Sequence, residues 1–362
     1  MSHSLSAKTS PTKHVPCSAT GDAVPIAIVG LGFGKWIVKA LCEPEMKKRF
    51  KIVALCDLDA ELAGNMAKEI GTRTATLEEL LVDPEVAAIG LFTGPVGRAG
   101  LLRKIIRAGK HVMTTKPFER DISAAREVLE EAQGLGKVIY LNSPSPVPAA
   151  DLLQIAEWRK KHALGRPLAA HASIWVRYNE KPDGRWLDDP QQCPVAPIFR
   201  LGIYLINDLV EIFGAAQEVQ VLSSRLFTER PTPDHAQLGI KFRNGGLASI
   251  LASFCVDDGD HYRNQLVLNF ENGTVYRNFN RKEQTGPCEL LLVMKDGDSA
   301  REVERVRLAE MSGQYPWDLF FEAVTSPTPA LFTDPEKVCA GLCVIEAMGR
   351  AQTEGVALVG GN

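Results

Sequence analysis

Three glycines lie close together near the start of the chain, at Gly30, Gly32 and Gly34, with Phe33 between the last two. They follow a short apolar run at residues 26–29 that suits a strand buried on both faces, and an apolar run typical of a helix follows them. Because glycine has no side chain, such a turn lets the backbone approach a pyrophosphate, whose charge is bound by the N–H groups of the helix's first turn. The pattern therefore predicts a dinucleotide-binding turn, although the third glycine comes one position earlier than in G-x-G-x-x-G.

Asp57 ends a second predicted strand, at residues 51–57. An acid at this place in a strand–helix–strand unit accepts hydrogen bonds from the ribose hydroxyls of an adenine dinucleotide. Its charge would repel the 2′-phosphate of NADP, and Lys35 could offset that repulsion. The cofactor is therefore NAD or NADP, with NAD favoured. The alternative to both is an ordinary glycine turn followed by a surface aspartate.

The elements that would position these residues alternate between buried strands and amphipathic helices. This alternation predicts a parallel sheet with right-handed crossovers. The expected strands are 26–29, 51–57, 86–92, 110–113 and 138–141, and the expected helices include 59–70, 76–81, 97–108 and 123–133. Ligands gather beyond the carboxyl ends of such strands. Further candidate cofactor residues follow these ends, namely Thr93, Pro95, Lys116, Pro117 and Asn142. Each could be an ordinary turn residue, but together they predict one crevice.

Beyond about Pro148 the pattern changes to a row of strands, several of which alternate apolar and polar residues as antiparallel strands with one wet face do. We expect an α/β domain of Rossmann type, with a doubly wound parallel sheet, at residues 25–147. An α+β domain with an open, mixed, mostly antiparallel sheet is expected at 148–362, where it would bind substrate and form oligomers. The last helices, near 317–324 and 335–353, can return to pack on the first domain. An exposed sheet face predicts a homodimer or homotetramer.

The composition is that of an ordinary globular protein, with 362 residues, 45% hydrophobic residues, 23% charged residues and a formal net charge of −3. No Lys/Arg run predicts binding to nucleic acid, and no apolar run approaches the ~20 residues that span a bilayer. Residues 1–24 have no apolar signal segment and are expected to be a disordered tail. The eight cysteines are scattered and typical of a reduced, cytoplasmic protein. Cys339 and Cys343 lie one helical turn apart, but no second pair completes a metal site, and we expect none.

A series of motifs follows this architecture along the chain: GLGFG, CDLDAE, LFTGP, GKHVMTTKPFERD, GRWLDDP and RLGIYLIND. In this order the chain resembles the glucose-fructose oxidoreductase / inositol dehydrogenase / MocA (Gfo/Idh/MocA) family over nearly all of its length after residue 24. The resemblance implies a Rossmann domain followed by an open mixed sheet. It also implies hydride transfer between NAD(P) and the carbinol carbon of sugars, inositols and related polyols.

The resemblance assigns roles in the first domain. Lys116 and Pro117 match the family's E-K-P motif, whose lysine lies at the nicotinamide and contacts the reacting oxygen, while Thr115 replaces the glutamate. Thr93 and Pro95 match the T-P-P segment that lies against the cofactor.

In the second domain, Trp186 begins a W-x-x-D-P pattern that leads to Tyr204. This tyrosine falls where the family carries a His or, in the glucose-fructose oxidoreductase and dihydrodiol dehydrogenase branches, a Tyr proton donor. The resemblance thus implies that Lys116 and Tyr204 are catalytic, and we take Trp186, Arg200 and Asp208 as candidate substrate-binding residues.

Arg200 stands four residues before Tyr204, at a position commonly occupied by Asp in the family. If the helix already includes residue 200, the two side chains share one helix face. A bidentate cation there suits a substrate with a carboxylate or phosphate, such as a sugar acid. The alternative is a structural ion pair with Asp188, Asp189 or Asp208.

The sequence therefore predicts an NAD(P)-dependent dehydrogenase or reductase that acts on CH–OH groups of a sugar, polyol or sugar-acid-like substrate. The altered T-P-P, E-K-P and Asp positions leave a second class open, a cofactor-binding sensor or regulator without turnover. No DNA-binding segment is visible, which argues against a direct repressor.

Overall fold

The computed structural model describes residues 23–178, 180–259, 262–279, 288–326 and 331–360. The chain divides into two compact units. The N-terminal unit comprises the described residues up to Val147 together with Tyr315–Cys339, and the C-terminal unit comprises Pro148–Gln314 and the chain from Ala340 onward. The expected tail, apart from its last two residues, lies outside the described residues.

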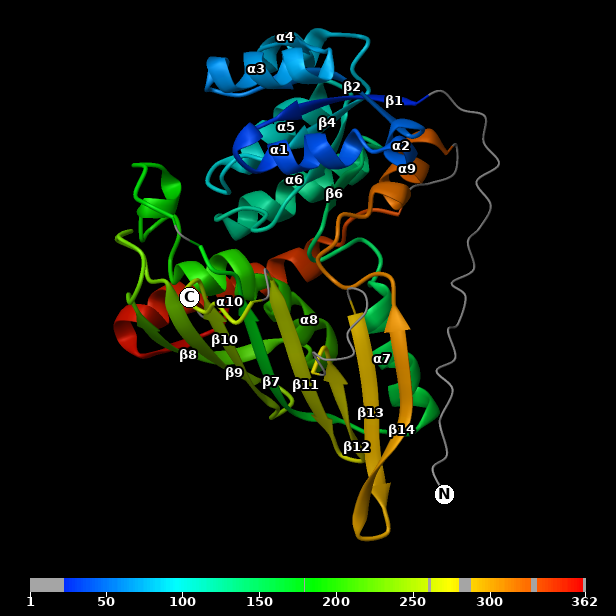
Figure 1. Cartoon of the computed structure of the whole chain (residues 1–362), viewed down its shortest axis with the longest axis vertical. Helices are drawn as coiled ribbons and strands as arrows, with labels where there is room; N and C mark the ends of the chain where they lie inside the picture. The colour runs from blue at the N-terminus through cyan, green and yellow to red at the C-terminus, as the bar shows by residue number, and fades with distance from the viewer. Residues whose placement is uncertain (1–22, 179, 260–261, 280–287, 327–330, 361–362) are drawn as a thin grey trace. The chain divides into compact units, whose positions relative to one another are not determined.

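The N-terminal unit is built on a six-stranded parallel sheet with the order β3-β2-β1-β4-β5-β6. Its strands are β1 (Val24–Val29), β2 (Phe50–Cys56), β3 (Arg73–Thr74), β4 (Ala88–Leu91), β5 (His111–Thr114) and β6 (Ile139–Leu141). The helices between them are α1 (Leu31–Leu41), α2 (Pro44–Lys47), α3 (Ala60–Ile70), α4 (Leu77–Val82), α5 (Arg98–Arg107) and α6 (Ile122–Gly134) (Figure 1). The chain order reverses between β1 and β4, which is where a doubly wound sheet binds its ligand. The predicted Rossmann architecture is confirmed.

Polar caps fix where these helices begin. The Asp59 side chain accepts a hydrogen bond from the Leu62 N–H at 2.9 Å and so caps α3. At α4, Thr76 and Glu79 form the reciprocal capping box that their T-x-x-E spacing predicts. Each cap satisfies backbone donors that the first helical turn leaves without an intrahelical partner.

A late segment of the chain completes the core of the N-terminal unit. Helix α9 (Trp317–Thr325) packs its aromatic side chains against β2, with the Trp317 ring 5.3 Å and the Phe320 ring 6.0 Å from the ring of Phe50. The Tyr140 hydroxyl on β6 donates to the carbonyl of Leu331 at 2.5 Å. Residues distant in sequence therefore belong to one hydrophobic core.

The C-terminal unit has a nine-stranded sheet with the order β14-β13-β12-β11-β7-β10-β9-β8-β15. Strands β7 and β10 pair in parallel and the other neighbours pair antiparallel, which confirms the predicted open mixed sheet. The strands are β7 (Pro167–Trp175), β8 (Ala216–Ser224), β9 (His235–Phe242), β10 (Leu247–Ser253), β11 (Arg263–Phe270), β12 (Gly273–Arg277), β13 (Cys288–Asp296), β14 (Ser299–Leu308) and β15 (Val356–Leu358). Alternate residues of β9 point into the core, as period-two patterning requires.

Helices α7 (Ala150–Lys161), α8 (Ile203–Phe213) and α10 (Pro335–Glu354) cover one face of this sheet (Figure 1). A π-helical turn, η2 (Ile198–Gly202), leads directly into α8. Sequence patterning did not predict this π-helical turn. Among the described residues, it also missed the short elements α2, β3 and β15, which are too brief to show a period.

Candidate functional site

Gly30 forms the tight turn between β1 and α1. Its φ is +86°, and a Cβ atom there would lie 2.8 Å from the carbonyl carbon and oxygen of Phe92. The Gly30 N–H donates to the Cys56 carbonyl at 2.9 Å, which fixes the turn against the end of β2. Any other residue would meet both backbone strain and a backbone clash, so this position requires glycine.

Of the next two glycines, Gly32 leaves open space beside the turn and Gly34 allows close packing. A Cβ at Gly32 would meet no atom within 4 Å, so this residue borders open space at the first turn of α1. A Cβ at Gly34 would lie 3.2 Å from a methyl carbon of Ile28, which means that this glycine lets helix and strand approach closely. The third glycine therefore performs its packing role although it comes one residue early. The turn fits a pyrophosphate, because backbone donors and free space coincide at Gly32.

Asp57 lies beside this turn. One carboxylate oxygen accepts from the Leu31 N–H at 2.5 Å and the other from the Asp59 N–H at 2.9 Å. The carboxylate is thereby held at the N-terminus of α1, where the helix dipole stabilises negative charge. The structure thus brings Asp57 and the glycine turn together, as the sequence pattern predicts.

The loop after β5 carries Lys116, and its backbone is held from two sides. The Lys116 N–H donates to the side-chain oxygen of the buried Asn142, at 3.3 Å, which links the ends of β5 and β6. Thr115, which replaces the glutamate of E-K-P, accepts from the Tyr315 hydroxyl at 2.8 Å. Burial raises the pKa of Tyr315, which keeps this hydroxyl a donor. The Tyr315 ring lies 6.1 Å from that of Phe33 in the glycine turn.

The loop after β4 contributes Thr93 and Pro95. Thr93 Oγ1 is buried and has no hydrogen-bond partner in the part of the chain that the structure describes. The carbonyl of Thr93 accepts from Arg98, a buried side chain that also reaches the loop after β5. Sequence reasoning missed both Arg98 and Tyr315. Arg98 looks like an ordinary helical surface residue, and Tyr315 lies far from Thr115 in sequence.

In the C-terminal unit, Tyr204 is the second residue of α8 and its ring faces a close-packed glycine. A Cβ at Gly313, whose φ is +95°, would lie 2.7 Å from Cδ1 of the Tyr204 ring. Trp186 lies in a 3₁₀ turn, η1 (Trp186–Asp188), with its ring 6.4 Å from that of Phe199. Tyr204 and Trp186 thus both belong to the C-terminal unit, each packed against its own backbone or ring partner.

Arg200 makes an ion pair, but not with any of the predicted partners. Its guanidinium donates to the two carboxylate oxygens of Glu180 at 2.6 and 2.8 Å and lies 4.7 Å from the ring centres of both Tyr178 and Phe254. Burial alone would lower the pKa of Arg200, but the hydrogen bonds and charge of Glu180 raise it. Arg200 thus makes a structural ion pair, as in the alternative interpretation, but its partner is Glu180 in place of an aspartate, and aromatic rings cover the cation.

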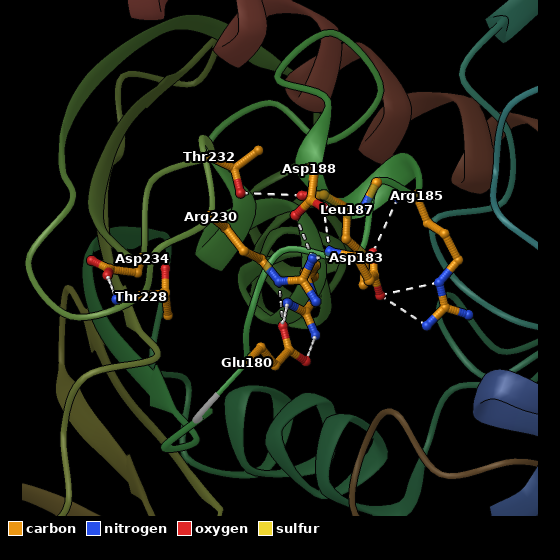
Figure 2. A network of polar contacts seen from close by, with 11 residues as sticks. Glu180, Asp183, Arg185, Leu187, Asp188, Thr228, Arg230, Thr232 and Asp234 are labelled. Carbon is orange, nitrogen blue, oxygen red and sulfur yellow. Dashed lines mark hydrogen bonds and ion pairs between the residues drawn. The ribbon is translucent and has the colours of Figure 1, made fainter.

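A second arginine holds the segment around Trp186. Arg230 pairs with Asp188, with Asp183 at 3.4 Å and, through Nε, with Glu180 at 3.3 Å. Figure 2 shows its guanidinium between these carboxylates. Asp188 is thus engaged by Arg230, while Glu180 is shared between Arg230 and Arg200.

Asp208 lies in a buried ion network. It accepts from Arg277 Nη1 at 2.8 Å and from the Ser312 hydroxyl at 2.9 Å, while Arg277 also donates to Asp151 at 2.7 Å. Burial raises the pKa of Asp208 and the charge of Arg277 opposes that shift. With 2% of its surface exposed, Asp208 links α8 to the end of β12 through Arg277, and its expected contact with substrate stays a prediction.

The described ranges contain neither a metal-binding cluster nor a membrane-spanning helix. No group of three or more His, Cys, Asp or Glu side chains there is arranged to hold a metal ion. None of the helices there is both long and apolar enough to cross a lipid bilayer.

Comparison with known proteins agrees with this geometry. A family model described as "Oxidoreductase family, NAD-binding Rossmann fold" matches residues 24–143, and one described as "GFO/IDH/MocA C-terminal domain" matches residues 152–276. The 1,5-anhydro-D-fructose reductase of Ensifer adhaerens is 27% identical over 211 residues, which cover 56% of this chain and 62% of that protein. An uncharacterised oxidoreductase of Schizosaccharomyces pombe is 24% identical over 58% of this chain and 56% of its own length. The chain thus matches less than two thirds of the length of either relative.

Solved structures share the fold over nearly the whole chain. The structure of GenD2 from gentamicin A biosynthesis, in complex with NAD, has a TM-score of 0.74 with 20% identity and covers 99% of this chain and 100% of that one. An aldose-aldose oxidoreductase from Caulobacter crescentus, complexed with glycerol, has a TM-score of 0.70 with 17% identity over 93% of this chain and 99% of its own. With both domains matched in order, the chain belongs to the GFO/IDH/MocA family of oxidoreductases.

Proposed function

We propose that this protein transfers a hydride between a nicotinamide cofactor and the carbinol carbon of a sugar or polyol. The observation that carries the proposal is the glycine turn, in which open space at Gly32 and the Asp57 carboxylate meet at the N-terminus of α1. The family match supports an oxidoreductase. The names of two similar proteins, a 1,5-anhydro-D-fructose reductase and an aldose-aldose oxidoreductase, support a carbohydrate-like substrate.

The residues of the N-terminal unit would hold the cofactor. The Gly32 and Phe33 N–H groups in the first turn of α1 would bind the pyrophosphate, while Asp57, which already accepts from the Leu31 N–H, would also accept from the adenosine ribose. We propose NAD as the preferred cofactor, because a 2′-phosphate would meet the Asp57 carboxylate. When bound, the nicotinamide supplies or accepts the hydride.

Two side chains would handle the proton and the reacting oxygen. Lys116 would hold that oxygen through its ammonium group, and Tyr204 would give the hydroxyl proton or take it. The tight support of Lys116 through Asn142 and of Tyr204 through Gly313 is what precise positioning requires.

The pairing of Arg200 with Glu180 supports a neutral substrate. An arginine whose charge is matched by a bidentate carboxylate has little attraction left for a substrate carboxylate or phosphate. We therefore propose a neutral polyhydroxylated substrate in preference to a sugar acid. Arg200→Met, with Glu180→Gln as its matched variant, should affect activity on neutral and acidic polyols equally. A loss of activity confined to acidic substrates would favour the sugar-acid hypothesis instead.

The experiment that tests the function combines cofactor binding with turnover. The purified protein is titrated with NADH and NADPH and then assayed on a panel of sugars, inositols and other polyols. Lys116→Ala and Tyr204→Phe should abolish turnover while cofactor binding persists. Lys51→Ala and Tyr276→Phe, on β2 and β12 and outside the set of candidate residues, serve as matched controls. If Lys116→Ala and Tyr204→Phe both retain turnover, the catalytic assignment is wrong.

A second outcome would favour the other class of function. Tight cofactor binding by a protein that oxidises and reduces nothing in the panel would indicate a sensor or regulator.

We also propose a homodimer or homotetramer, since several leucines with exposed side chains, among them Leu222 and Leu247, lie on the nine-stranded sheet. Light scattering should give a multiple of the 39.5 kDa chain, and a monomer mass would refute the assembly.

A further inference from the structure

Arg98, the first residue of α5, has a buried guanidinium that binds backbone rather than carboxylate groups. Only 1% of its surface is exposed. Its Nη1 atom donates to the carbonyl of Thr115 at 2.6 Å, to that of Phe118 at 3.0 Å and to that of Pro117. Its Nη2 atom donates to the carbonyl of Thr93. One side chain therefore gathers the carbonyls of two separate loops.

Both loops leave the sheet at the edge where a parallel sheet binds its ligand. Thr93 follows β4, and the Thr115–Phe118 segment follows β5, a neighbouring strand. Carbonyls on both sides of Lys116 in sequence are held by Arg98. The backbone on which Lys116 stands is thus fixed at two points by one planar group.

Glu119, in the loop after β5, binds the start of α5 in turn. It is 2% exposed and accepts from the N–H groups of Gly97 at 3.2 Å and Ala99 at 2.7 Å, which caps the first turn of α5. The start of α5 is therefore bound to the loop after β5 by a carboxylate on one side and a guanidinium on the other. Burial lowers the pKa of Arg98 to about 10 and the charge of Glu119 opposes this shift, so the guanidinium stays charged at neutral pH.

A buried charge without a direct carboxylate partner is unfavourable unless its hydrogen bonds are made. Removing it leaves several buried carbonyls without a donor, each of which then loses a charge-assisted hydrogen bond. Lysine cannot replace it, because a single ammonium group does not span two loops in the way that a planar fork does. The arrangement is therefore specific for arginine.

We propose that Arg98 is a positioning residue of the cofactor site: it holds the loops after β4 and β5 in one conformation and so places Thr93 and Lys116. The expected effect of Arg98 on cofactor binding and turnover rests on the proposed function. The expected ordering of the two loops by Arg98 does not, because it follows from the hydrogen bonds alone.

The test compares Arg98→Lys and Arg98→Ala with Arg103→Lys. Arg103 lies on the same helix and makes surface ion pairs with Glu127 and Glu131, so its substitution matches the chemistry without touching the loops. In Arg98→Lys the dissociation constant for NADH should rise about tenfold or more, and kcat should fall as Lys116 loses its place. Arg103→Lys should leave both unchanged. A loss of thermal stability in Arg98→Lys with an unchanged NADH constant and kcat would overturn the proposal.

Chemical rescue separates positioning from general stability. Guanidinium ions, at concentrations well below those that denature proteins, should restore NADH binding to Arg98→Ala, whereas methylammonium should not. Equal effects of the two ions would contradict a role for the planar fork. If Arg98→Ala does not fold, the hydrogen exchange of Arg98→Lys described next decides the role of Arg98.

Amide hydrogen exchange gives a readout that does not depend on the cofactor. Arg98→Lys should speed exchange in segments 93–97 and 115–119, while exchange in α3 and in the Arg103→Lys variant stays at the wild-type rate. Unchanged exchange in both segments would overturn the proposal even if activity fell. If the wild-type protein binds neither NADH nor NADPH, the proposed function fails, and the exchange measurement still decides the role of Arg98.

Discussion

Replacing Gly32 with alanine should separate cofactor binding from folding. A Cβ at this position meets no atom within 4 Å and the backbone is not left-handed, so the variant carries no strain. Alanine in place of a helical glycine stabilises by up to ~1 kcal/mol, and the melting temperature should stay the same or rise. The added methyl nevertheless occupies the space through which a pyrophosphate approaches the backbone. Losing one charge-assisted hydrogen bond costs about 1.5–3 kcal/mol, so binding should weaken about ten- to hundredfold.

Two other glycines provide the comparison. Gly30→Ala forces a side chain into a φ of +86° and against the Phe92 carbonyl, and the left-handed conformation alone costs about 1–2 kcal/mol, so this variant should lose stability as well as binding. Gly64→Ala, inside α3 and also without a neighbour within 4 Å, should change neither property for the worse. Comparing the three variants separates the effect of the position from the general effect of replacing glycine with alanine.

The assay is a fluorescence titration with NADH alongside a thermal melt of each variant. Wild-type affinity in Gly32→Ala would refute the assignment of this turn to a pyrophosphate. If Gly32→Ala lost both binding and melting temperature, as Gly30→Ala should, the conclusion that alanine fits at position 32 without strain would be wrong.

Three further perturbations follow from the same structure. Arg277→Met leaves two buried aspartates without their cation and should destabilise the protein by about 3–5 kcal/mol, measured by urea unfolding against the surface variant Arg301→Met. Burial lowers the pKa of His111 from 6.5 to about 4, so the unfolded chain binds a proton in this window that the native chain does not. Stability should therefore fall as pH drops from 6.5 to 4, and His111→Gln should flatten that part of the curve in melts at several pH values. Asp57→Asn removes the charge that repels a 2′-phosphate and should lower the preference for NADH over NADPH in paired titrations, while an unchanged ratio would refute that role.

Much of the N-terminal unit could be predicted from the sequence because its signals are local. The strand–turn–helix around Gly30 and the capping box at Thr76 each depend on residues within a few positions of one another. The row of strands in the C-terminal unit was equally visible, since period-two patterning repeats along the chain.

The supports of the site could not be predicted, because they join distant segments. Tyr315 reaches Thr115 across 200 residues of sequence, and Arg98 is defined by carbonyls, which every residue carries. The pairing of Arg200 illustrates a second limit. Several acids lie near it in sequence, and spacing did not single out Glu180. The π-helical turn at 198–202 also removes the assumption that Arg200 and Tyr204 share an α-helical face.

The proposed function is that this chain exchanges a hydride between a nicotinamide cofactor and a hydroxyl-bearing carbon. The most direct measurement follows the absorbance of reduced nicotinamide while the protein is mixed with NAD or NADP and each member of the polyol panel. At least one neutral sugar or polyol should yield reduced cofactor at a rate that vanishes in Tyr204→Phe and persists in Tyr276→Phe. Bound cofactor with no reduction on any substrate, or a rate indifferent to Tyr204, would contradict it.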